Sequence, residues 1–172
     1  HPAVHGGILA DRSNEAHMAA LESQGIEPID LVCVNLYPFE QTIARPDVTP
    51  DQAIEQIDIG GPSMVRSAAK NHDFVAVVTD PSQYDHVANC LDANQGATTF
   101  ELRRGLASEA FAHTAAYDAA IARWMSATTD VPFAENLVMC FHRHPTELRY
   151  GENPHQSGAL YIDPHNTEPA VV

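Results

Sequence analysis

Positive charge is scarce in this sequence. Its 172 residues hold 9 lysines and arginines against 23 aspartates and glutamates, which gives a formal net charge of -14. The few basic residues are scattered and form no patch. A chain with this charge repels phosphodiester backbones and anionic lipid surfaces, so nucleic acid and membranes are not expected as partners.

Long hydrophobic runs and paired cysteines are also missing. No apolar run approaches the length that spans a bilayer, and the N-terminus lacks signal-peptide organisation, so the expected location is cytoplasmic. The three cysteines have no spacing typical of a zinc site, a redox dithiol or a disulfide framework. Cys33 and Cys90 are expected to be small buried apolar residues.

No metal site is expected from the histidines. His1 and His5 lie four residues apart, but Pro2 and the glycine pair at 6–7 argue against a helix that would place both on one face. The segment 1–7 has the composition of a loop, and with no initiator Met it suggests that the chain is a fragment.

Strand-like and helix-like segments alternate along the chain, which is typical of an α/β fold with a parallel sheet. The apolar, β-branched runs 30–36 and 74–79 fit strands covered on both faces. The segment 126–132 has the character of a boundary, and 136–141 fits a further strand. Helices are expected over 14–24, after the capping box at 49–52, over 81–91 and over 98–124.

The most informative segment is 57–63, which runs through Asp58, Gly60 and Gly61 into Pro62 and Ser63. It predicts the entry into a helix, whose first amides lack intrahelical partners and can bind an anion. If the helix continues unbroken, Ser63 shares a face with a cation seven residues on, Lys70. A glycine-containing turn with a solvated lysine remains the alternative.

Other polar residues fall where ligands collect in open α/β sheets. Asn35 and Tyr37 end the first expected strand, where the alternative is a half-buried tyrosine at a plain strand end. His113 lies within a long helical segment and fits a packing contact better than catalysis. The polar segment 149–156 suggests a ligand-binding loop, with a polar hairpin as the alternative.

Together these segments resemble the bifunctional purine-biosynthesis proteins that carry 5-aminoimidazole-4-carboxamide ribonucleotide (AICAR) formyltransferase and inosine monophosphate (IMP) cyclohydrolase. Six stretches match in the family's order and cover nearly the whole chain. They are 1–9, 35–39, 55–63, 68–72, 111–118 and 148–156.

The resemblance implies a fold like that of methylglyoxal synthase, a parallel sheet with flanking helices, here without its first strands and phosphate loop. Residues 1–130 would form most of the cyclohydrolase domain and 131–146 a linker. Residues 147–172 would begin a second α/β domain, the formyltransferase. A serine- and glycine-containing loop and a Lys-Thr-Leu of the family, whose lysine belongs to the active site, lie outside the sequence.

The resemblance also implies a reaction. The carboxamide nitrogen of the formylated substrate attacks the formyl carbon, and loss of water closes the purine ring. The family's site includes the positions of Asp58, Lys70 and Tyr37. We expect Asp58 to accept or position the amide proton, and Lys70 to stabilise the negative oxygen or assist its departure as water.

The expected substrate-binding positions follow from the same resemblance and from charge. Tyr37 and Asn35 would orient the substrate, and the helix start would hold the oxyanion through its backbone. The full substrate-binding set is Asn35, Gly60, Gly61, Ser63, Arg149 and Tyr150.

The expected partners are purine nucleotide precursors and, in the intact protein, a second copy in a homodimer. The cyclohydrolase step needs no cofactor, whereas the formyltransferase step uses 10-formyltetrahydrofolate. The fragment alone is expected to be inactive, and it can also fail to fold if strand faces stay uncovered. The competing class is a methylglyoxal-synthase-like regulatory domain that binds a small molecule without catalysis.

Overall fold

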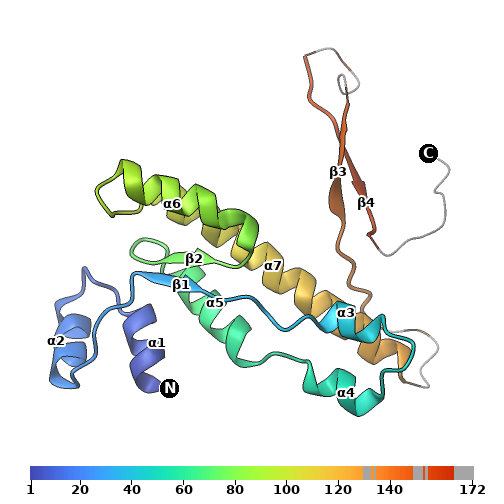
Figure 1. Cartoon of the computed structure of the whole chain (residues 1–172), viewed down its shortest axis with the longest axis horizontal. Coiled ribbons are helices and arrows are strands. Elements are labelled where there is room, and N and C mark those ends of the chain that lie inside the picture. The colour runs from blue at the N-terminus through green and yellow to red at the C-terminus, as the bar shows by residue number, and fades with distance from the viewer. Residues whose placement is uncertain (130–132, 134, 149–152, 154, 165–172) are drawn as a thin grey trace. The chain divides into compact units, whose positions relative to one another are not determined.

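The structure is a computed structural model that describes residues 1–129, 133, 135–148, 153 and 155–164. The chain forms two compact units, His1–Ile121 and Ala122–Val172. The helices are α1 (Pro2–Leu9), α2 (Glu15–Ser23), α3 (Phe39–Ile43), α4 (Pro50–Glu55), α5 (Gly60–Lys70), α6 (Tyr84–Ala93) and α7 (Phe100–Ala127), with a 3-10 turn η1 (Pro81–Gln83) (Figure 1). The strands are β1 (Leu31–Cys33), β2 (Ala76–Val78), β3 (His142–Glu147) and β4 (Ala159–Ile162).

Two parallel strands form the centre of the first unit. β1 pairs with β2 in the register Leu31 to Ala76 and Cys33 to Val78, and α3, α4 and α5 lie between them in the chain. Side chains of α5, α6 and α7 join β2 in one apolar core, which includes Val65, Val77 and Leu106. The expected α/β fold with a parallel sheet and flanking helices is therefore confirmed.

The two strands differ in burial. All three residues of β2 are buried, as expected for a strand covered on both faces. In β1 only Val32 is buried, whereas Leu31 and Cys33 are exposed. The prediction of two covered faces was wrong for β1, and so was the prediction of a buried Cys33, because the described helices cover only one face of this strand. The apolar run showed that the strand is hydrophobic, but it could not show which helices pack against each of its faces.

The N-terminal segment is a helix, which corrects the predicted loop. Pro2 occupies the first helical position, where its fixed φ and missing N–H cost nothing, and the Nδ1 atom of His1 accepts the Ala3 N–H at 3.2 Å. Packing outweighs the low helix propensity of the two glycines. A Cβ atom on Gly7 would lie 2.7 Å from the carbonyl oxygen of Glu27, so only glycine permits this close approach.

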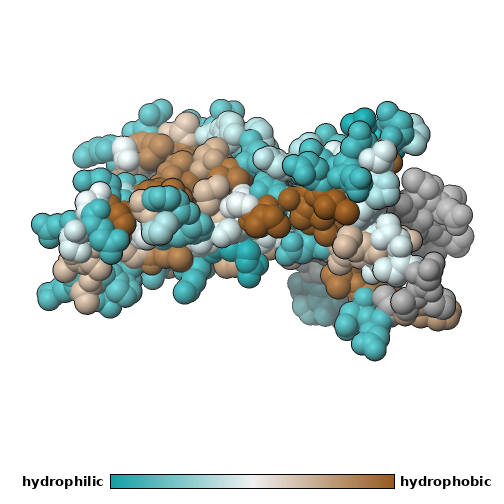
Figure 2. Space-filling view, turned by 90° about the horizontal axis from the view of Figure 1, so that it is seen from below, coloured by the Kyte–Doolittle hydropathy of each residue, from teal (hydrophilic) through white to brown (hydrophobic). Residues whose placement is uncertain are grey.

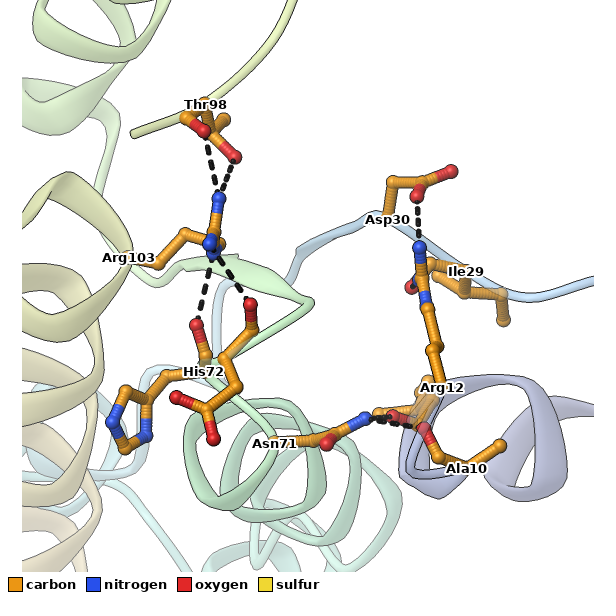
Figure 3. A network of polar contacts seen from close by, with 10 residues as sticks. Ala10, Arg12, Ile29, Asp30, Asn71, His72, Thr98 and Arg103 are labelled. Carbon is orange, nitrogen blue, oxygen red and sulfur yellow. Dashed lines mark hydrogen bonds and ion pairs between the residues drawn. The ribbon is translucent and has the colours of Figure 1, made fainter. Parts of the chain in front are cut away.

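Hydrogen bonds from side chains to the backbone connect the helices and strands of the first unit (Figure 3). The guanidinium of Arg103 on α7 donates to the carbonyl oxygens of His72 at 2.9 Å and Thr98 at 2.7 Å. It also donates to the carbonyl oxygen of Asp73 at 2.8 Å. One side chain thereby satisfies the turn that leads from α5 into β2 and the segment that precedes α7.

A second group of contacts ties α1 to the sheet and to α5 (Figure 3). Asn71, which caps the C-terminus of α5, donates to the carbonyl oxygen of Ala10 at 3.0 Å. Arg12 binds the carboxylate of Asp30 at 2.6 Å and the carbonyl oxygen of Ile29 at 2.8 Å. The start of β1 is therefore held at the end of α1.

The remaining expectations for helices are largely confirmed. Thr49 and Gln52 form the predicted capping box of α4, and Gly25 adopts a φ of 62° just after α2. The expected strand at 136–141 was misplaced, since β3 begins at His142 and pairs antiparallel with β4 in the second unit. The described residues 137–141 have no regular structure.

Hydrophobic residues also reach the surface. Figure 2 shows them between hydrophilic residues on the face that it presents. Ile59, directly before α5, is 78% exposed, and Ile54 on α4 is 51% exposed. Among the described residues, no helix is both long and apolar enough to cross a membrane.

We predict opposite effects of alanine at two helical glycines. Gly7→Ala should lower the free energy of unfolding by about 2 kcal/mol, because the new methyl group collides with the Glu27 backbone. Gly105→Ala in α7 should raise it by about 1 kcal/mol, because Gly105 has open space around it and alanine favours a helix. Urea unfolding followed by circular dichroism measures both, and equal effects would contradict the close packing of α1.

Candidate functional site

The carboxyl ends of β1 and β2 lie side by side because the strands are parallel, and polar side chains follow both ends. Beyond β1 come Asn35 and Tyr37, both exposed, with Tyr37 at 54%. Beyond β2 come Thr79 and Asp80, which lead through η1 into α6. This is the edge at which open α/β sheets collect ligands, so the structure places Asn35 and Tyr37 as the sequence predicts.

Asp58 also lies beside this edge, in the loop between α4 and α5. Its Oδ1 atom accepts the N–H of Gly61 at 2.7 Å, and its Oδ2 atom accepts the N–H of Tyr37 at 3.4 Å. The carboxylate therefore joins the chain after β1 to the start of α5. The structure brings Asp58 and Tyr37 together, through the tyrosine's backbone.

The glycine pair at the start of α5 has two different roles. A Cβ atom on Gly61 would lie 2.5 Å from the Asp58 carboxylate and 2.8 Å from the Leu36 side chain, so this position has no room for one. A Cβ atom on Gly60 would meet nothing within 4 Å. Gly61 is needed for close packing, whereas Gly60 is exposed.

Fewer amides of α5 are free for an anion than the sequence alone indicates. The Gly61 N–H already donates to Asp58, and Pro62 has no N–H. Asp58 thus satisfies one of the orphan donors of the helix itself. Of the first three helical residues, Gly60 keeps an amide to which the structure gives no partner among the described residues.

Lys70 lies at the other end of α5. The helix runs unbroken from Gly60, so Ser63 and Lys70 share a face as predicted, and both are exposed. Ten helical steps separate Gly60 from Lys70, a rise of about 15 Å. No ion pair joins Lys70 to Asp58 in the part of the chain that the structure describes. The structure does not bring these two charges together.

Tyr117 holds the Asp58 loop and was missed in the sequence. Its hydroxyl accepts the backbone N–H of Asp58 at 2.8 Å and donates to the carbonyl oxygen of Gln56 at 3.0 Å. Its ring meets the buried ring of Phe39 edge to face, with centroids 6.3 Å apart. Burial raises the pKa of this hydroxyl above its ordinary value of 10.0, with a smaller contribution from the nearby Asp58 charge.

Tyr84 was missed as well. It begins α6 directly after η1, and its hydroxyl oxygen accepts the Asn35 side-chain N–H at 3.4 Å and faces the Cys33 thiol at 3.7 Å. The sequence carries a signal for the local position of Tyr84, since Asp80 and Gln83 form a capping box just before it. The contact with Asn35 spans 49 residues and has no local signal.

His113 lies on α7, as the sequence predicts for a packed residue of a long helix. Its Nε2 atom is buried and has no hydrogen-bond partner in the described structure. Four residues earlier on the same helix, Glu109 accepts the side-chain N–H of Gln83 at 2.5 Å. The nearby charge of His113 is among the smaller influences that hold the pKa of Asp80 below its ordinary value, after its hydrogen bonds to Ser82.

Two predicted site residues, Arg149 and Tyr150, lie outside the described residues. Within the described residues, no three His, Cys, Asp or Glu side chains come close enough together to hold a metal ion. The candidate site is therefore the edge formed by Asn35, Tyr37, Asp58 and the start of α5.

Comparisons with known proteins first define the fold. A model of the MGS-like domain matches residues 3–63. A solved structure titled "Crystal structure of ForH" superposes with a TM-score of 0.66 at 38% identity, over 74% of this chain and 65% of that one. The protein is thus of the α/β class with an MGS-like domain.

The family follows from a second match. The model of the AICARFT/IMPCHase bienzyme covers residues 68–172, more than half of the chain. The Bifunctional purine biosynthesis protein PurH of Listeria innocua is 53% identical over 99% of this chain, and that of Synechococcus sp. strain WH7803 is 54% identical over 95%. This chain belongs to the AICARFT/IMPCHase bienzyme family. It spans about a third of the length of these relatives, 33% and 32%.

We predict that Tyr117→Phe lowers the free energy of unfolding by about 1 to 2 kcal/mol, because the Asp58 N–H and the Gln56 carbonyl lose their partner. The raised pKa of Tyr117 also has a pH signature. Above about pH 10 the tyrosine loses its hydroxyl proton more readily in the unfolded chain than in the folded one. The free energy of unfolding should therefore fall as the pH rises, and it should fall less in the Tyr117→Phe variant.

Chemical denaturation at pH 8 and at several pH values above 10 measures both effects. Tyr161→Phe is the matched control, since Tyr161 is 58% exposed in the second unit. A Tyr117→Phe protein as stable as the control would show that the hydroxyl does not hold the loop.

Proposed function

We propose that this chain supplies one wall of an IMP cyclohydrolase site in a bifunctional enzyme of de novo purine biosynthesis. The observation that carries the proposal is the meeting of Asp58, Tyr37 and the start of α5 at the carboxyl edge of a parallel sheet. The family membership supports it, since each relative reported above is named a bifunctional purine biosynthesis protein.

The substrate is the formylated carboxamide ribonucleotide, and the reaction is ring closure. The carboxamide nitrogen forms a bond to the formyl carbon, whose oxygen becomes negative as the nitrogen loses a proton. That oxygen then takes up a proton and leaves as water together with the proton of the formamide nitrogen, while the carboxamide nitrogen keeps its second hydrogen. Two proton transfers and one oxyanion need protein groups.

Asp58 is the base of this scheme, because its carboxylate lies beside Tyr37 at the edge and is half-buried there. Its hydrogen bonds to two backbone amides fix the direction of the carboxylate. Tyr37 and Asn35 orient the substrate.

Lys70 is the cation that offsets the developing negative charge. It is the one lysine of the 172-residue sequence. Ser63 lies on the same face of α5, and long side chains in helices usually extend toward the helix N-terminus. We place the remaining anion contacts at Gly60 and Ser63, since the Gly61 N–H that the sequence also offered already donates to Asp58.

The other half of the activity is AICAR formylation, with a folate co-substrate, 10-formyltetrahydrofolate. Arg149 and Tyr150 are the residues that we assign to its nucleotide site. We place the cyclohydrolase domain at 1–130, a linker at 131–146 and the start of the formyltransferase domain from 147. The expected partners are purine nucleotide precursors and a second copy of the protein, in the cytoplasm. No observation favours the purely regulatory alternative.

We predict that Asp58→Asn lowers the rate of ring closure by about a hundredfold or more in the complete protein that carries this chain. Asparagine keeps an oxygen for the Gly61 N–H, so the helix start is preserved while the base is lost. Lys70→Ala should cost about a hundredfold through loss of oxyanion stabilisation. Product formation from the formylated substrate gives the rates, and circular dichroism verifies folding.

Matched controls are Asp92→Asn and Arg104→Ala, which remove one charge each at exposed helical positions away from this edge. Both controls should keep the parent rate. If folded Asp58→Asn and Lys70→Ala proteins also keep it, the site described above is wrong and the non-catalytic class becomes the better interpretation.

A further inference from the structure

The hydroxyl group of Tyr84 occupies a fixed place at the carboxyl edge of the sheet. The capping box that Asp80 and Gln83 form sets the backbone just before it, and the Gln83 side chain also accepts the N–H of the buried Thr79 at 2.8 Å. Tyr84 is nevertheless 43% exposed. The backbone that carries Tyr84 is thus fixed after β2, and its side chain is open to a ligand.

A count of donors and acceptors shows what this group can still bind. The Tyr84 oxygen accepts from the Asn35 amide nitrogen at 3.4 Å and from the Cys33 thiol at 3.7 Å, so its own hydrogen remains available. The Asn35 amide nitrogen uses one of its two hydrogens in this contact, and the Asn35 Oδ1 atom is left as an acceptor. Neither the hydrogen nor Oδ1 has a partner among the described residues.

The free Tyr84 donor beside the free Asn35 acceptor complements an amide, which presents a carbonyl oxygen and an N–H side by side. We propose that Tyr84 and Asn35 form the subsite for the carboxamide group of the substrate. Tyr84 donates to the carboxamide oxygen, and Asn35 Oδ1 accepts one of its N–H groups. The inference rests on the proposed function and adds Tyr84 to its binding residues.

The surroundings favour this neutral group over the phosphate of the nucleotide. The side chains that contact the Tyr84 hydroxyl, Asn35 and Cys33, carry no positive charge. The carboxylate of Asp80 lies four residues earlier and would repel an anion, and its pKa is held below the ordinary value by hydrogen bonds to Ser82. A phosphate would require a cation or free backbone amides.

The subsite would also orient the reaction. A primary carboxamide has two N–H groups, and Asn35 holds one of them. The other is left for removal by the base, while the tyrosine fixes the rotation of the group about its bond to the ring. Near-attack geometry of the nitrogen then depends on two hydrogen bonds, one from the segment after β1 and one from the start of α6.

Nucleotide selectivity tests the proposal directly. IMP carries a ring amide with the same adjacent carbonyl and N–H, whereas adenosine monophosphate has an amino donor and a ring-nitrogen acceptor, the reverse order. The complete protein should bind IMP more tightly by calorimetry. Tyr84→Phe should weaken IMP binding about tenfold and leave adenosine monophosphate unchanged, since one hydrogen bond is lost only with the amide.

Kinetics supply a second readout. Tyr84→Phe should raise KM for the formylated substrate about tenfold with a smaller change in kcat, because the lost hydrogen bond holds substrate already in the ground state. Asn35→Asp should raise KM at least as much as Tyr84→Phe does. The new carboxylate cannot donate to the tyrosine oxygen and instead accepts the hydrogen of the tyrosine hydroxyl. Tyr161→Phe is the matched control and should match the parent in both assays.

The outcomes separate this inference from the proposed function. If the parent protein does not close the ring, the proposed function fails and the subsite fails with it. If the parent does so but Tyr84→Phe binds and turns over like the control, the subsite alone is wrong. Equal weakening of both nucleotides would also overturn it, since that result indicates a general packing role for the tyrosine.

Discussion

The parallel pairing of β1 with β2 is the contact on which the candidate site depends. Three residues in each strand set the register, and Val34 extends it by donating to the Val78 carbonyl oxygen at 2.9 Å. Because both strands point the same way, the chain leaves both at one edge, 45 residues apart in sequence between Cys33 and Val78. Asn35 from one strand end and Tyr84 from the next segment can meet only there.

Asp58 serves two purposes at this edge. Its carboxylate caps α5 through the Gly61 N–H and is also the group that we propose as the proton acceptor. The helix cap and the proposed proton transfer therefore depend on the same side chain. Tyr117 fixes the backbone of the same loop from α7, which limits how far the carboxylate can turn away from the helix.

Local patterns predicted most of the fold, and long-range contacts account for the differences. The capping box at Thr49 and the helix that passes through Lys70 follow from a few neighbouring residues. The α1 helix was missed because Gly7 is tolerated only through packing against a distant backbone. The exposed face of β1 could not be inferred from its apolar run, since burial depends on which elements cover it.

The same distinction holds for the site. Asp58, Asn35 and Tyr37 lie where a strand end or a helix start would place them, and each could be named from the sequence. Tyr84 and Tyr117 could not, because each acts through a hydroxyl group that meets a residue about 50 to 60 positions away. Gly60 and Gly61 show one further consequence. Although both positions hold glycine, they tolerate different substitutions. Many side chains fit at Gly60, whereas Gly61 has no room for any residue that has a Cβ atom.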